Sequence, residues 1–199
     1  MAGYYIGEIT ITDLGAYEDY KPMAHSAIRS FGGDYIVRGG KTESLEGKAP
    51  RGRIVMIKFP SVEVCKTWFG SEEYAPAHAI RNRAAVSRTF VVEGPDIEPV
   101  HGMGAAGYYI GERDVHDEEG YAKYARFAGL TIEEHKGEYL VKGGAWERLE
   151  GAAPMPRVIV VRFPSVTACM DWYNSDDYDH VHPMRDKAAK SRTFVVEGV

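Results

Sequence analysis

An eight-residue string, SRTFVVEG, occurs twice in this chain, at Ser87–Gly94 and again at Ser191–Gly198. Chance does not produce an exact repeat of that length in a 199-residue chain. A missed repeat would misassign the whole architecture, so internal repetition has to be recognised before any fold is considered. Shifted by the offset that takes Ser87 to Ser191, the sequence keeps matching without a gap, and about half of the aligned residues are identical. The chain therefore contains two copies of one domain.

The repeat also sets the domain boundaries. Each copy has an ordinary single-domain length, long enough to bury its own core. The stretch between the copies, PDIEPVHGMGAA, is rich in Pro, Gly and Ala and has no apolar periodicity, which is typical of a linker. We expect a first repeat at residues 1–94, a linker at 95–106 and a second repeat at 107–199.

Composition excludes several classes of partner. The net charge of −5 offers no basic footprint for nucleic acid, and no apolar run reaches the length of a membrane span. The chain starts directly with a strand-like segment rather than a signal peptide, so we expect a cytoplasmic protein. Cys65 and Cys169 occupy the same position in the two copies, on an apolar helix face that indicates buried packing. A disulfide between them remains an open alternative.

Apolar spacing predicts four strands and two helical regions in each copy. Gly39-Gly40 ends the second strand, and the following LEGKAPRG is typical of a flexible loop. In the first copy we expect a strand at 4–11, a helix from an N-cap at Thr12 or Asp13 to Phe31, strands at 34–38 and 53–59, a helix around 64–69 that continues as a helical piece from 71 to about 85, and a strand at 88–93.

This order, strand-helix-strand-strand-helix-strand, is ferredoxin-like and belongs to the α+β class. Such a unit has both helices on one sheet face and leaves the other face bare. RIVMIKF and TFVVE are apolar on both sides, which indicates burial on both faces. We predict two ferredoxin-like βαββαβ repeats packed face to face as a dimeric α/β barrel closed within one chain, an intrachain pseudo-dimer. Closure between chains is the alternative, and further homodimerisation stays open.

The motif set resembles a known family. YYIGEI, D-x-x-x-Y-x-x-Y, GGxYxxRGG, LEG, FPS, C-x-x-W-[FY]-x-S-x-x-Y and a closing VVEG are similar to the bacterial domain-of-unknown-function family 1330. That family belongs to the dimeric α/β-barrel superfamily, which includes monooxygenases, cyclases, isomerases, haem peroxidases, chlorite-decomposing enzymes and ligand binders. The resemblance implies a fold rather than an activity. It also implies a ligand pocket in each half, between helices and sheet, although the usual family member has one copy and dimerises between chains.

Two sets of residues are candidates for proton transfer in such a pocket. The first helix of each repeat carries two tyrosines three residues apart on one face, which could hold or protonate a substrate oxygen; packing with the hydroxyl at the edge is the alternative. The first strand carries one carboxylate, which could be a general base or could be paired with an arginine such as Arg53. These candidates are Tyr17, Tyr20, Tyr121, Tyr124, Glu8 and Glu112.

The later helical segment adds an i, i+3 pair. His78 and Arg81, with His182 and Arg185, combine a group suited to proton transfer with a planar fork suited to a carboxylate; an exposed helix face is the alternative. His25 has Gly129 as its counterpart and could make the first half distinct. The remaining substrate-binding candidates are Trp68 and Trp172.

No metal or cofactor motif emerges. His180 and His182 are a short pair without a third ligand, and the glycine-rich stretches lack the context of a phosphate loop. We therefore expect a cofactor-independent lyase, isomerase, cyclase or hydrolase that acts on a small polar or aromatic carbonyl compound. The alternatives are a non-catalytic small-molecule binding protein and a structural pseudo-dimer without a ligand.

Overall fold

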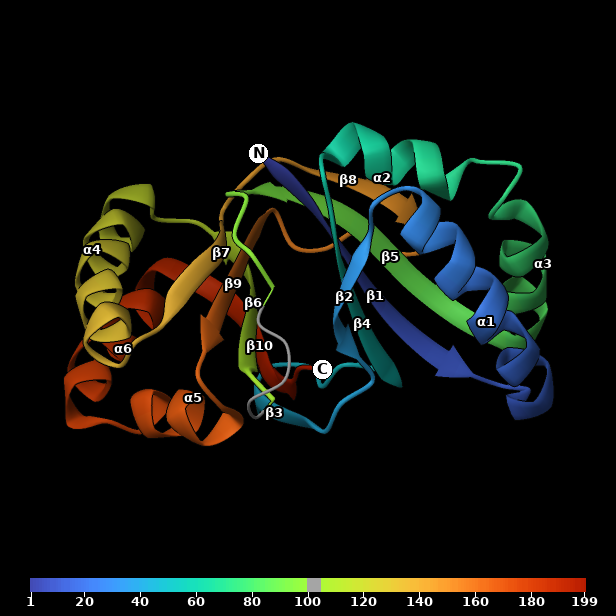
Figure 1. The fold of residues 1–199 in the computed structure, drawn as a ribbon. Helices are drawn as coiled ribbons and strands as arrows, with labels where there is room; N and C mark the ends of the chain where they lie inside the picture. The colour runs from blue at the N-terminus through green and yellow to red at the C-terminus, as the bar shows by residue number, and fades with distance from the viewer. Residues whose placement is uncertain (100–104) are drawn as a thin grey trace. The chain divides into compact units, whose positions relative to one another are not determined.

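The computed structural model describes residues 1–99 and 105–199, so the predicted linker lies partly outside the described residues. Both repeats follow the same order of elements (Figure 1). The first has β1 (Ala2–Ile11), α1 (Leu14–Ser30), β2 (Asp34–Arg38), β3 (Thr42–Glu46), β4 (Arg53–Phe59), α2 (Val62–Phe69), α3 (Ala75–Ala84) and β5 (Ala85–Gly94). The second has β6 (Gly107–Val115), α4 (Glu118–Glu134), β7 (Glu138–Lys142), β8 (Trp146–Glu150), β9 (Arg157–Phe163), α5 (Val166–Tyr173), α6 (Asp176–Ala188) and β10 (Ala189–Glu197).

Local sequence explains where the helices begin and end. The Asp13 carboxylate accepts a hydrogen bond from the Ala16 N–H at 3.1 Å, which confirms the predicted N-cap of α1. Ser61 caps α2 in the same way, through the Val64 N–H. Past the end of α1, Gly32 adopts a φ of +69°, a left-handed conformation that favours glycine. These local signals mark the two ends of α1 and the start of α2.

The strands form two separate five-stranded sheets and are not closed into one barrel. Their orders are β2-β4-β1-β5-β8 and β3-β10-β6-β9-β7. Four strands of each sheet come from one repeat in ferredoxin-like order, and the fifth comes from the other repeat. The α+β class and the two ferredoxin-like halves within one chain are confirmed, whereas face-to-face packing of the sheets stays a prediction.

Two compact units result from this exchange of strands. The first unit consists of Met1–Gly40, the described residues from Pro50 onward in the first repeat, and Gly144–Ala153. The second unit holds the rest of the described chain, including Lys41–Ala49. Each unit is thus one repeat plus a short segment of the other. The sequence boundaries proposed at residues 94 and 107 stay a prediction for the repeats themselves.

The prediction that no strand lies between Arg38 and Arg53 is wrong. β3 occupies this stretch, and its counterpart β8 lies at the equivalent place in the second repeat. The two helical pieces predicted after Pro60 are present as α2 and α3. β8 pairs antiparallel with β5, and β3 pairs antiparallel with β10. Both strands are short, polar and partly exposed, so they lack the alternating apolar pattern that marks a strand in sequence.

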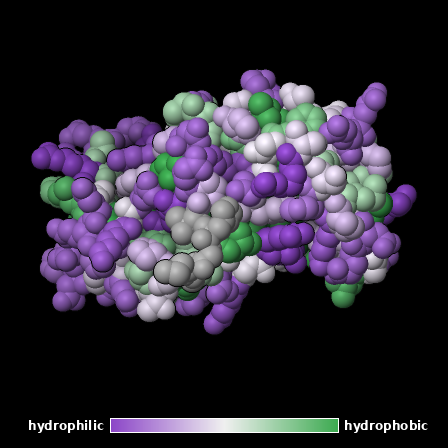
Figure 2. Space-filling model, viewed as in Figure 1, coloured by the Kyte–Doolittle hydropathy of each residue, from purple (hydrophilic) through white to green (hydrophobic). Residues whose placement is uncertain are grey.

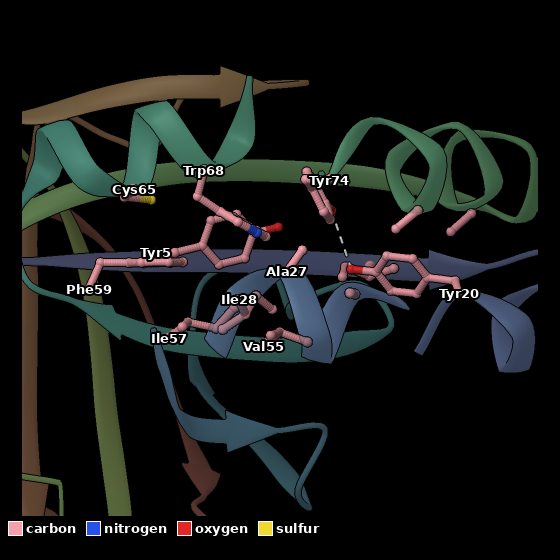
Figure 3. Packing of buried hydrophobic residues seen from close by; sticks show 14 of the residues in the cluster. Tyr5, Tyr20, Ala27, Ile28, Val55, Ile57, Phe59, Cys65, Trp68 and Tyr74 are labelled. Atoms are coloured by element: carbon pink, nitrogen blue, oxygen red, sulfur yellow. Dashed lines mark hydrogen bonds between the residues drawn. The ribbon is translucent and has the colours of Figure 1, made fainter. Parts of the chain in front are cut away.

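The core of the first unit lies between its helices and one face of its sheet. Tyr5 of β1 and Trp68 of α2 pack edge to face with centroids 5.5 Å apart (Figure 3). Cys65 is completely buried beside them, and both cysteines are free, so the packing role is confirmed. Four consecutive residues of β4, Ile54–Ile57, are buried, which confirms that both faces of this strand are covered.

Candidate functional site

An arginine of the last helix is buried at the centre of each unit. Arg81 of α3 has no exposed surface. Its Nη1 donates to the hydroxyls of Tyr5 at 3.1 Å and Tyr74 at 3.0 Å, and its Nη2 donates to the carboxylate of Glu150. A buried guanidinium has to be paired or hydrogen-bonded, because losing water costs several kcal/mol per ion. Glu150 belongs to β8, so the other repeat supplies the counter-charge.

The second unit repeats this arrangement. Arg185 of α6 is fully buried and donates to the Tyr178 hydroxyl at 3.0 Å and to the Glu46 carboxylate at 2.7 Å. Glu46 lies on β3 of the first repeat. Sequence reasoning missed both carboxylates, although the LEG motif that contains them was visible in each copy. Their role appears only once the strands are exchanged.

In each unit, the histidine predicted beside the arginine contacts the same carboxylate as that arginine. The Nε2 of His78 lies 3.0 Å from Glu150, and the Nε2 of His182 lies 3.2 Å from Glu46. Each predicted His–Arg pair therefore converges on one glutamate.

Glu46, His182 and Asp186 also place possible ligand atoms within 4.8 Å of one another. Arg185 already donates to both carboxylates, at 2.7 Å to Glu46 and 3.0 Å to Asp186. A metal ion at this position would have to compete with a fixed, buried cation, so the donor set does not fit a metal.

The tyrosines of the first helix line the space between helix and sheet. The Tyr20 hydroxyl lies 3.4 Å from that of Tyr74 (Figure 3), and the Tyr124 hydroxyl lies 3.0 Å from that of Tyr178. Burial raises the pKa of Tyr17 to about 12 and that of Tyr124 to about 12. These phenols therefore stay protonated at neutral pH, and their O–H groups can serve as hydrogen-bond donors.

The strand glutamates lie elsewhere. Side chains alternate along β1, so Glu8 points to the face opposite Tyr5 and the helices. Glu8 forms an ion pair with Arg88 at 2.5 Å, and Glu112 forms one with Arg192 at 2.6 Å. Arg53, the suggested partner, donates to the backbone carbonyl of Arg38. Both glutamates are ion-paired on the sheet face away from the candidate pockets.

The other candidates divide between surface and core. His25 is exposed on α1 and stacks on Tyr35 with ring centroids 5.9 Å apart; it is not among the residues that line either cavity. Trp68 and Trp172 are buried in the walls of the two cavities. They differ in one contact: the Trp172 Nε1 donates to the Thr131 hydroxyl at 2.9 Å, whereas the Trp68 Nε1 has no partner.

The two units have cavities of very different size in the same place. The cavity of the first unit has a volume of about 20 Å³, room for a single water, and that of the second unit about 220 Å³. At the helix edge of the first cavity, Lys21 and Glu18 form an ion pair at 2.5 Å. Their counterparts are Ala122 and Ala125, both in the wall of the larger cavity. Lys21 is one wall residue whose long side chain the second repeat replaces with a methyl group. The larger cavity is lined by Tyr109, Arg113, Tyr121, Ala122, Tyr124, Ala125, Ile132, Tyr139, Lys142, Gly143, Arg157, Ile159 and Trp172.

Arg113 is the decisive residue that the sequence analysis missed. It occupies the position of Ile9, in the inward register of the first strand, and is only 1 % exposed. A Cβ at Gly111 would lie 2.8 Å from its Nη1, so the guanidinium folds back over a glycine. The detectable signal was a cation that replaces an apolar residue at an inward strand position of one repeat.

The partners of Arg113 are all neutral. Its Nη1 donates to the Thr193 hydroxyl at 2.9 Å and to two backbone carbonyls, and its Nη2 donates to the Tyr109 hydroxyl at 2.5 Å. Its Nε is buried without a partner. Within residues 1–99 and 105–199, no carboxylate lies within ion-pair distance of it. A buried cation with neutral partners makes this cavity electrostatically positive.

Hydrophilic side chains predominate on the face shown in Figure 2, with hydrophobic residues scattered among them. None of the helices in the described ranges is both long and apolar enough to span a bilayer.

Solved structures share this fold at low identity. A protein from Lactobacillus acidophilus, provisionally described as a monooxygenase, aligns with a TM-score of 0.54 at 11 % identity, covering 100 % of this chain and 98 % of its own. An anthrone oxidase-like protein aligns at 0.53 and 12 % identity, covering 100 % and 91 %. A protein provisionally assigned as a chlorite dismutase aligns at 0.57 and 8 % identity, covering 100 % and 94 %. These likenesses establish the dimeric α/β-barrel fold type and nothing finer.

Sequence comparison identifies the family. A search of curated proteins found no significant match. The family named "Domain of unknown function (DUF1330)" matches twice, over residues 2–95 and 106–199, which confirms the resemblance seen in the motifs. The chain therefore belongs to the DUF1330 family and carries two copies of its domain in one polypeptide.

Proposed function

We propose that the working site is the cavity of the second unit, and that the protein acts there on a small polar or aromatic carbonyl compound as a cofactor-independent enzyme. One observation carries the proposal. The Tyr109 hydroxyl, on the cavity wall, accepts hydrogen bonds from two buried arginines, Arg113 at 2.5 Å and Arg185 at 3.5 Å.

This geometry leaves the Tyr109 proton for a ligand. A phenol oxygen has two acceptor lone pairs and one proton, and the two guanidiniums take up the lone pairs. The O–H can then be donated to a carbonyl oxygen, while the positive charge of Arg113 stabilises the negative charge that develops there. Donors placed in advance at a developing oxyanion are commonly the largest single contribution to catalysis.

The cavity has room for a ring-sized molecule. A cavity of about 150 Å³ holds benzene, and this one measures about 220 Å³. Tyr121, Tyr124 and Tyr139 supply aromatic surface, and burial keeps their hydroxyls protonated by raising each pKa. The fold relatives that are described as a monooxygenase and as anthrone oxidase-like agree with small-molecule chemistry in this architecture but do not select a reaction. We place this activity in the cytoplasm, without a nucleic-acid or membrane partner.

A second candidate is a non-catalytic binding protein. It is favoured by the composition of the wall: none of the residues that line this cavity in the described part of the chain is a carboxylate or a histidine. His182 stands behind Arg185, against Glu46, and not in the wall. A reaction that needs a protein base would therefore lack one, whereas a reaction driven by stabilising an oxyanion would not.

The test is exchange of the α-hydrogens of acetophenone and phenylpyruvate in D2O, followed by proton NMR. Deuteroxide from the solvent takes the α-proton, the Tyr109 hydroxyl and Arg113 stabilise the enolate oxygen, and D2O returns a deuteron to the carbon. Tyr109→Phe removes the proposed donor, and Tyr5→Phe is the matched control, since it removes the equivalent hydroxyl beside the closed cavity. Enhanced exchange with the wild type and Tyr5→Phe, but not with Tyr109→Phe, supports the enzyme. Binding of the probes without exchange supports the binding protein, and absence of both overturns the proposal.

A further inference from the structure

We infer that the cavity of the second unit takes an anion, specifically a small carboxylate on a ring-sized body, that Arg113 binds its carboxylate, and that the chain has one such site rather than two. This inference rests on the proposed site and adds the class of its ligand.

Comparison of the two units isolates the charge that needs a partner. In the first unit the buried Arg81 has the carboxylate of Glu150, brought by the exchanged strand. In the second unit Arg185 has the equivalent carboxylate, Glu46. Arg113 is an additional buried cation, and Ile9 stands at its position in the first unit. The exchange of strands supplies no second carboxylate for it.

The neighbouring charges only partly compensate Arg113. Burial disfavours the charged form of Glu46, but Arg185 and, after it, Arg113 help to hold the pKa of its carboxyl below the ordinary value, so this one carboxylate faces two buried cations and is hydrogen-bonded to Arg185. Asp186 is an extra acid of the second unit, but it bonds Arg185 and its side chain is 51 % exposed, where water screens its charge. Arg157 is paired with the exposed Glu118 at 3.1 Å. Lys142 lies over the Tyr139 ring at 4.7 Å. Among the described residues that line the cavity, the charged ones are all cations, namely Arg113, Lys142 and Arg157.

Donor geometry favours a carboxylate. A guanidinium has five N–H donors in a planar fork that matches two carboxylate oxygens. On Arg113 the Nε–H has no partner, and Nη2 donates to the Tyr109 hydroxyl. The Nε side of the Arg113 guanidinium thus has donor capacity left, and the neighbouring Tyr109 hydroxyl can donate a further hydrogen bond. The aromatic surface of Tyr121 and Tyr139 suits a planar body attached to that carboxylate.

The first unit lacks the space and the additional fully buried cation. Lys21, Arg38 and Arg53 also line its cavity, but none of them is fully buried, and they contact Glu18, the Tyr35 ring and the Arg38 carbonyl, respectively. Its cavity of about 20 Å³ holds no more than a water, and Ile9 offers no charge. We therefore expect one ligand per chain. The first repeat supplies Glu46 as the ion-pair partner of Arg185 in the second unit and binds no ligand of its own.

The experiment is a titration of the ¹⁵N-labelled full chain with benzoate and with benzamide, a neutral molecule of nearly the same shape. The tryptophan indole N–H signals report position, because Trp172 lines the second cavity and Trp68 the first. We expect benzoate to shift the Trp172 signal and not the Trp68 signal, and benzamide to bind at least ten-fold more weakly.

Variants assign the contact. Arg113→Ile recreates the residue of the first repeat and should weaken benzoate binding by about 10- to 100-fold, since hydrogen bonds to charged groups are worth that much. Arg113→Lys should fall in between, because it keeps the charge without the fork. Arg29→Gln, an exposed arginine of the first unit, is the control for net charge. Circular dichroism confirms that each variant is folded.

The outcomes separate the two proposals. Equal binding of benzoate and benzamide, or benzoate binding unchanged in Arg113→Ile, would overturn the inference that Arg113 binds a carboxylate. A cavity that binds carbonyl compounds would still be possible in that case. Shifts of both tryptophan signals at matched concentrations would overturn the single site. No binding of benzoate, benzamide or the carbonyl probes would overturn both proposals together.

Discussion

Glu150→Gln is the sharpest test of the exchanged strand. The substitution keeps the size of the side chain and removes the charge that compensates Arg81, whose side chain is 0 % exposed. Arg81 keeps its hydrogen bonds to the Tyr5 and Tyr74 hydroxyls and loses its charge partner. The substitution also removes the negative charge beside the Nε2 of His78, 3.0 Å away. Removing one member of a buried ion pair costs about 3–5 kcal/mol. Because the Glu150 side chain is 26 % exposed and water screens part of its charge, we expect a loss of about 2–3 kcal/mol.

The same strand offers a matched control. Glu147 of β8 pairs with Lys66 at 3.0 Å, but their side chains are 51 % and 35 % exposed. An exposed pair of this kind contributes at most about 1 kcal/mol. Glu147→Gln therefore removes one negative charge and one ion pair from the same strand with little expected effect.

The assay is urea unfolding followed by tryptophan fluorescence and by circular dichroism, with coincident transitions required before a free energy is derived. The midpoint should fall by about 1 M for Glu150→Gln, given a slope of about 2 kcal/mol per molar, and should barely move for Glu147→Gln. The double variant Arg81→Met/Glu150→Gln should lose less than the sum of its single variants. Equal effects of Glu150→Gln and Glu147→Gln would refute the reasoning, because the buried cation would then not depend on its partner.

Two further predictions concern the second unit and the difference between the repeats. Burial disfavours the charged form of Glu46, but Arg185 and the Tyr173 hydroxyl outweigh it and hold the pKa of this carboxyl below its ordinary value. The stabilisation of the fold by ionised Glu46 is therefore complete above the unfolded pKa of about 4.3 and is lost as the pH falls through the lower folded pKa. Urea unfolding between about pH 5 and pH 3 should show that the free energy of unfolding depends less steeply on pH in Glu46→Gln than in the wild type. Equal pH dependence in the two proteins would contradict this. Ala27→Thr should give the Trp68 Nε1 the acceptor that Thr131 gives Trp172. We expect it to raise the free energy of unfolding by about 0.5–1 kcal/mol after the helix-propensity cost of Thr, and a lowered thermal midpoint would show that the hydroxyl does not fit.

The sequence by itself determined the architecture of each repeat. The repeated SRTFVVEG string disclosed the duplication, and β2 at Asp34–Arg38, β4 at Arg53–Phe59 and α2 at Val62–Phe69 fall at or within a few residues of the predicted positions. These elements are marked by local signals, namely apolar periodicity, caps and glycine stops, which act within a few residues along the chain. For the same reason the burial of Cys65 followed from its helix face alone.

Only the tertiary structure decided where the charges meet. Glu46 lies on the short polar strand β3, whose partner β10 is more than a hundred residues away in sequence. Glu150 lies on the equivalent strand β8, whose partner β5 is over fifty residues away. No local sequence pattern therefore marks these two glutamates. Arg113 is one of many differences between the repeats, and only its place in the fold, inside a cavity and against Tyr109 and Thr193, gives it significance. Burial turns an exposed, freely solvated charge into one that needs a partner, and burial is a property of the folded chain rather than of any stretch of its sequence.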